Sequence, residues 1–65
     1  MTKVETLRGS EITRLPMVVA HAVTRFAEIE EIEVWKTGAP SGEHFEYRLF
    51  RANCKRPCVR ICLSE

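Results

Sequence analysis

Three cysteines at four-residue intervals carry the most reactive chemistry in this chain. They lie in the stretch CKRPCVRIC, as Cys54, Cys58 and Cys62. Thiols can bind a metal, form a disulfide or act as nucleophiles, and each of these roles needs the sulfur close to another ligand, a second thiol or a base. What these cysteines can do therefore depends on whether the segment is a helix or a strand.

The residues around the cysteines favour a strand. Val59, Ile61 and Leu63 alternate with other residues, which is the two-residue period of a half-buried strand. Pro57 lacks a backbone N–H, and it fits at the entrance of such a strand. In an extended chain Cys58 and Cys62 are about 13 Å apart. That separation is too large for one zinc ion or for a disulfide.

The spacing of potential ligands does not match a zinc site. Two close pairs of cysteine or histidine are missing, and only a partial site of Cys54 and Cys58 with His44 or His21 can be drawn. We therefore predict no metal site and no cofactor, and interpret the cysteines as small, partly buried apolar residues. A small zinc- or thiol-dependent regulator remains an alternative.

Catalytic motifs are missing from the sequence. It contains no phosphate-binding loop, no dinucleotide-binding glycine motif and no hydrolase or zinc-protease signature. Lys55 and Arg56 could lower the pKa of Cys54, but a chain of 65 residues offers little wall for a substrate pocket. We predict that the protein is not an enzyme and has no small-molecule substrate.

Length and composition restrict the class of protein. With 65 residues, we expect one domain spanning 1–65 and a small core. Ten basic residues oppose nine acidic ones, so no strong overall field attracts nucleic acid or an anionic membrane. The N-terminus lacks the apolar core of a secretory signal, and the odd cysteine count is typical of reduced thiols. We expect a cytoplasmic protein without membrane association.

One segment has the apolar period of an amphipathic helix. The stripe consists of Leu15, Val18, Val19, Ala22, Val23 and Phe26. Because proline is tolerated in the first turn, Pro16 helps to place the start, with Thr13 or Ser10 as the N-cap. We predict a helix over residues 14–28.

Two strands follow, and the residues between them predict a hairpin. EIEVWK and HFEYRLFR both alternate, and TGAPSGE between them is rich in turn residues. Ile32 opposite Leu49 would pair apolar residues, and Glu33 opposite Arg48 would pair opposite charges. In the same register Val34 faces Tyr47, and Glu30 can reach Arg51.

The elements together predict an α+β domain in which one amphipathic helix packs on a three-stranded antiparallel β-meander. Residues 1–8 could add a short N-terminal edge strand. The helix can cover only one face of this sheet. The other face would carry Trp35, Phe50 and the cysteines among charged residues, and Trp, Phe and Arg are enriched where proteins meet. The predicted partner-binding residues are Trp35, Arg48, Phe50 and Arg60.

The function that we expect is that of a small non-enzymatic binding protein, an inhibitor or adaptor, which docks its sheet on a macromolecular partner or on a second copy to form a homodimer. This class includes proteins encoded by phages and mobile elements. The alternative is a nucleic-acid-binding module, because residues 47–64 contain no acid. Its candidate contacts are Arg48, Arg51, Lys55, Arg56 and Arg60.

Overall fold

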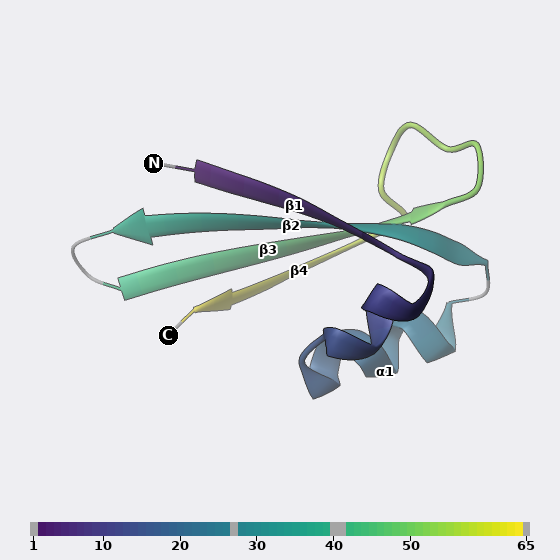
Figure 1. Cartoon of the computed structure of the whole chain (residues 1–65), viewed down its shortest axis with the longest axis horizontal. Coiled ribbons are helices and arrows are strands. Elements are labelled where there is room, and N and C mark those ends of the chain that lie inside the picture. The colour runs from purple at the N-terminus through teal and green to yellow at the C-terminus, as the bar shows by residue number, and fades with distance from the viewer. Residues whose placement is uncertain (1, 27, 40–41, 65) are drawn as a thin grey trace.

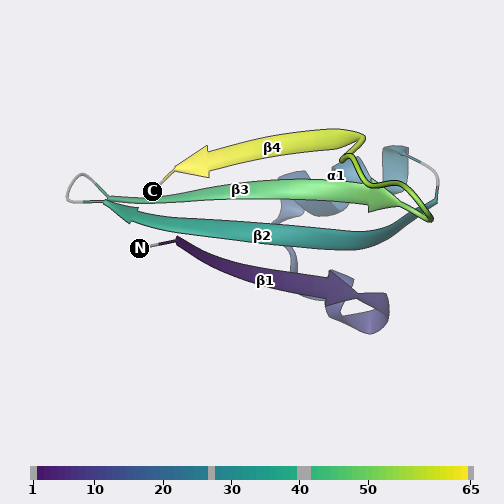
Figure 2. The same cartoon turned by 90° about the horizontal axis from the view of Figure 1, so that it is seen from above.

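The computed structural model describes residues 2–26, 28–39 and 42–64, and it has an α+β architecture (Figure 1). Four antiparallel strands form one sheet in the order β1-β2-β3-β4, and one α-helix lies against one face (Figure 2). The elements are β1 (Thr2–Arg8), a 3-10 helix η1 (Gly9–Arg14), α1 (Met17–Arg25), β2 (Ile29–Ala39), β3 (Gly42–Arg51) and β4 (Val59–Ser64). The predicted three-stranded meander is thus extended by the N-terminal edge strand, which is seven residues long.

The predicted hairpin register is confirmed along most of its length. Ile32 pairs with Leu49, Glu33 with Arg48, and Val34 with Tyr47. The register changes beyond Glu31, because the pairing shifts between Ile29 and Glu31 and sets Ile29 rather than Glu30 opposite Arg51. Such a shift inserts an extra residue and increases the local twist of the strand.

The helix is shorter than the predicted span of 14–28. It begins at Met17 with Pro16 as N-cap, and it ends at Arg25. Leu15 has an extended ψ of 153°, because the ring of the following proline disfavours the helical region for the residue before it. The prediction of Thr13 or Ser10 as the N-cap is wrong, because both residues belong to η1, in which the Thr13 hydroxyl donates to the Ser10 carbonyl at 2.8 Å.

The apolar core lies between the sheet and the helical segment. Val19 is the one buried residue of α1, and it is fully buried. On the sheet, Ile32 and Leu49 are also fully buried, and Leu7 and Tyr47 complete the cluster. Val59, Ile61 and Leu63 pack against this cluster at its edge, as their alternation predicted. The long strands extend beyond the short helix, which covers only one end of its face of the sheet (Figure 1).

The opposite, uncovered face is called the outer face here, and its side chains form rows across all four strands. One row contains Thr2, Thr37, His44 and Ser64; the next contains Val4, Trp35, Glu46 and Cys62; the third contains Thr6, Glu33, Arg48 and Arg60. Residues directly opposite each other in a sheet point to the same face. The first row therefore brings both ends of the described chain to the same end of the sheet.

The segment between β3 and β4 lies on the side of the sheet away from α1 (Figure 1). The Cys54 N–H donates to the Arg51 carbonyl at 3.2 Å, and the Cys58 N–H donates to the Leu49 carbonyl at 2.9 Å. Phe50 precedes this segment and is only 8% exposed, although it is not part of the core cluster below the sheet. The structure therefore buries apolar area on both faces near this end.

Candidate protein-binding surface

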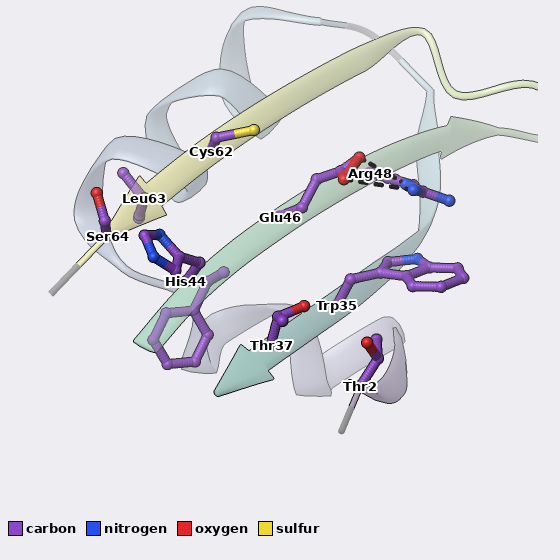
Figure 3. A pocket seen from close by; sticks show the side chains of 10 residues that line it. Thr2, Trp35, Thr37, His44, Glu46, Arg48, Cys62, Leu63 and Ser64 are labelled. Carbon is purple, nitrogen blue, oxygen red and sulfur yellow. Dashed lines mark hydrogen bonds and ion pairs between the residues drawn. The ribbon is translucent and has the colours of Figure 1, made fainter. Parts of the chain in front are cut away.

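Trp35 and Arg48 form the centre of a compact cluster on the outer face (Figure 3). The guanidinium carbon of Arg48 lies 4.1 Å from the centroid of the Trp35 ring. The indole N–H of Trp35 donates to Glu33 Oε1 at 3.0 Å. Arg48 donates to both carboxylate oxygens of Glu46, at 2.7 Å and 3.3 Å. We call Glu33, Trp35, Glu46 and Arg48 the Trp35–Arg48 cluster.

Strand alternation explains why these four side chains meet. Glu33 and Trp35 are two residues apart on β2, and Glu46 and Arg48 are two residues apart on β3, so each pair points to one face. The register places Trp35 opposite Glu46 and Glu33 opposite Arg48. The sequence correctly predicted the Glu33–Arg48 facing pair. However, Arg48 hydrogen-bonds to Glu46, and Glu33 accepts from the indole instead.

The ion pair within the cluster shifts the ionisation of both partners. The hydrogen bond from Arg48 lowers the pKa of Glu46, and the charges of Arg48 and Arg60 lower it further. The same hydrogen bond raises the pKa of Arg48. Arg60 lies directly opposite Arg48 on β4, and like charges in that position repel. Glu46 is thus the carboxylate that offsets two neighbouring arginines, a role that the sequence prediction missed.

A shallow concave surface adjoins the cluster (Figure 3). Trp35 and Arg48 lie on one side of it, and His44 and Cys62 on the other. It is lined by Thr2, Trp35, Thr37, His44, Phe45, Glu46, Arg48, Cys62, Leu63 and Ser64. Its residues come from all four strands, and Thr2 belongs to the edge strand whose pattern was weak in the sequence. The indole of Trp35, the guanidinium of Arg48, the imidazole of His44 and several hydroxyl groups can therefore contact one partner together.

Of the four residues predicted to bind a partner, the structure brings Trp35, Arg48 and Arg60 onto the outer face. Trp35 and Arg48 are half-buried, whereas Arg60 is exposed. Phe50 lies two residues after Arg48 on β3 and so points to the same face, but it is only 8% exposed. It therefore offers little area to a partner. The alternation of β3 alone does not reveal this burial.

The three cysteines are free and exposed, so the interpretation of them as partly buried apolar residues is wrong. Cys54 and Cys58 precede β4, and Cys62 lies within it as predicted. The Cys58 thiol donates to the Leu49 carbonyl, with Sγ 3.4 Å from the oxygen. Within the described ranges, no three histidine, cysteine or acidic side chains gather as a metal site would require.

The basic residues considered for nucleic acid divide into two groups. Arg48 is half-buried and bound to Glu46. Arg51, Lys55 and Arg56 lie at and after the end of β3 and are exposed, as is Arg60 on the outer face. The structure therefore separates Arg48 from the group at the loop, and the loop residues form the more accessible positive surface.

Comparison with protein-family models finds no match for the chain, and comparisons with curated proteins and with solved structures also find none. Across the described part of the chain, no helix has the length and apolar character needed to cross a membrane. The function therefore has to be argued from the surfaces of the sheet.

Proposed function

We propose that the protein is a non-enzymatic binding module that docks a protein partner on the outer face of its sheet. The observation that carries this proposal is the Trp35–Arg48 cluster beside a concave surface built by four strands. Tryptophan and arginine are the residue types that most often dominate binding energy at protein interfaces.

The cluster is also held in place before binding. Arg48 has two hydrogen bonds to Glu46, and the Trp35 indole has one to Glu33. Side chains that are already ordered lose less conformational entropy when a partner arrives. Their apolar and charged surfaces are therefore presented at a reduced entropic cost.

A capture experiment with matched variants tests this proposal. Immobilised wild-type protein would be compared with Thr37→Glu, which adds a charge to an exposed position of the concave surface, and with Trp35→Ala. The control is Met17→Ala, because Met17 is 86% exposed on α1, on the other side of the sheet. We expect the wild type and the control to retain the same partner and both outer-face variants to lose it.

The chain's single tryptophan provides a direct measurement. Titration of the captured partner should change the emission of Trp35, because contact alters the polarity around the indole. Retention of the partner by Thr37→Glu and Trp35→Ala, together with unchanged Trp35 emission when the partner is added to the wild type, would show that binding does not use this face.

A second candidate function is nucleic-acid binding through the basic loop. Lys55 and Arg56 are exposed in a stretch, residues 47–64, that contains no acid. Binding of random single-stranded DNA and RNA would be titrated at increasing salt, with Lys55→Ala/Arg56→Ala as the variant. Phosphate contacts predict affinity that falls steeply with salt, and absence of binding at low salt would remove this candidate.

A further inference from the structure

The two edges of the sheet differ in how they are protected. β1 carries Lys3, Glu5 and Arg8 within its seven residues, and charged residues on an edge strand oppose pairing with another chain. β4 has one charge, Arg60, and three large apolar residues that remain half-exposed. Among the described residues, no element lies beyond Val59–Ser64 at this edge (Figure 2).

The monomer exposes more surface than a chain of its mass usually does. Its accessible area is 4872 Å², whereas a folded monomer of 7.5 kDa typically exposes about 4,200 Å². The difference is roughly 600 Å² per chain. Two such areas correspond to about 1,200 Å², which is the lower limit of a specific protein–protein interface.

We propose that a second copy of this chain pairs with β4 through its open edge, so that two four-stranded sheets join into one antiparallel eight-stranded sheet. The pairing is two-fold symmetric, so each copy presents the same surface to the other. It satisfies backbone groups that the edge exposes, and it brings the apolar side chains of the two β4 strands into contact.

Side-chain chemistry selects the register of this pairing. Symmetry allows the axis to pass through Arg60, Ile61, Cys62 or Leu63. An axis at Arg60 sets two arginines directly opposite each other, and an axis at Ile61 leaves them diagonal neighbours, about 7–8 Å apart. An axis at Leu63 pairs only residues 62–64 of the two strands. With the axis at Cys62, residues 60–64 pair, each Arg60 faces Ser64 of the other copy, and the two guanidinium groups are well separated.

The Cys62 register also brings compatible side chains of the two copies together on each face of the sheet. On the face covered by α1, Ile61 of one copy lies opposite Leu63 of the other, and this contact occurs twice. These residues continue the apolar surface formed by Tyr47 and Phe45, their neighbours on β3. On the outer face, the two small Cys62 side chains face each other at the axis.

The proposed dimer leaves the Trp35–Arg48 cluster free. Trp35 is on β2, and β3 separates it from the paired edge. Because the symmetry axis is perpendicular to the sheet, both clusters would lie on one side of the joined sheet. The dimer does not require the outer-face partner proposed above, so either inference can fail without the other.

Cysteine cross-linking tests the edge and the register together. In Cys54→Ser/Cys58→Ser the remaining thiol is Cys62, and paired residues across such strands are close enough for a disulfide. Under mild copper-catalysed oxidation we expect most of the protein to become a covalent dimer of twice the 7.5 kDa chain mass. The control replaces all three cysteines by serine and carries Val4→Cys on the other edge strand, at a position 49% exposed.

The control is expected to cross-link slowly and with little yield. A Cys62 variant that cross-links no faster than the Val4→Cys control would overturn the proposal. Faster cross-linking by the control would also overturn it, because the association would then use β1.

Sedimentation velocity of the wild type gives an independent readout over a roughly hundredfold range of concentration. We expect the mass to rise from that of one chain to that of two. Cys62→Arg places two like charges at the axis and should weaken the dimer by up to about fivefold. Thr6→Arg, a matched change at an exposed position of β1, should not.

Circular dichroism checks that both arginine variants remain folded. We expect them to fold because both positions are exposed. A wild type that stays monomeric at every concentration, or equal effects of the two arginine substitutions, would refute the pairing at β4.

Discussion

The most informative test of the packing compares two adjacent valines of α1. Val19 is fully buried, whereas Val18 is 52% exposed. Both residues have the same chemistry in the same helix, so the substitutions Val19→Ala and Val18→Ala differ mainly in the burial of the methyl groups that they remove.

The expected magnitude follows from this difference in burial. Two buried methyl groups contribute about 0.8 kcal/mol each, and the cavity that they leave adds up to about 1 kcal/mol. Alanine offsets about 0.5 kcal/mol of this loss through its higher helix propensity. We expect Val19→Ala to lower the free energy of unfolding by about 2 kcal/mol, and Val18→Ala to leave it nearly unchanged.

Thermal and urea unfolding, followed by circular dichroism, measure both effects. For a domain of this size, 1 kcal/mol corresponds to a change in Tm of about 4–8 °C, so Val19→Ala should lower the Tm by roughly 10 °C. A domain this small has a total stability of only about 3–5 kcal/mol, which makes the loss easy to detect. Equal effects of the two substitutions, or a larger effect of Val18→Ala, would refute the observed orientation of α1.

Two further predictions concern ionisation and backbone conformation. An NMR titration of Glu46 should give a midpoint below the ordinary value of 4.5, and Arg48→Ala should raise it. Because the folded-state pKa is below that of the unfolded chain, the stabilisation from this pair is complete above pH 4.5 and is lost as the pH falls through the folded-state pKa. Glu28 has a φ of +69°, where a β-branched residue is strained. Glu28→Val should therefore lower the free energy of unfolding by about 1 kcal/mol relative to Glu28→Gly, and equal stability in urea unfolding would contradict this.

The hairpin was the most predictable part of the fold. Its register rests on local complementarity, because a shift by one residue would move the apolar side chains of one strand to the face opposite those of its partner. In the sequence, Ile32 opposite Leu49 pairs two apolar residues, and Glu33 opposite Arg48 pairs opposite charges. The structure confirms both pairs. The shift at Glu30 was not predictable from pairing rules, because an inserted residue interrupts the pattern that those rules use.

The edge strand and the start of the helix were less predictable. β1 contains only two apolar residues, Val4 on the outer face and Leu7 in the core, so its alternation is weak. Its position is fixed by pairing with β2, which is distant in the sequence. At the helix, the apolar stripe was correct for Val19, Ala22 and Val23 but wrong for Val18 and Phe26, which are exposed. Leu15 does pack against the core, but from outside the helix, because Pro16 favours an extended backbone at this position.

The candidate surface was predicted in part. Alternation placed Trp35 and Arg48 on the same face, which the structure confirms. It did not predict that Glu46 would take the ion pair, since a residue two positions along the same strand competes with the one directly opposite. The burial of Phe50 was also not predicted, because alternation gives the face on which a residue lies and not how much of it other residues cover.

The row that contains Thr2 and Ser64 has a consequence for the connectivity of the chain. These residues are separated by three interstrand spacings, or about 14 Å, a distance that roughly five extended residues can span. A peptide bridge between them would close the backbone into a ring without changing which strands are neighbours. Reopening that ring at the exposed Lys55 would make β4 the first strand of a permuted sequence with the same sheet.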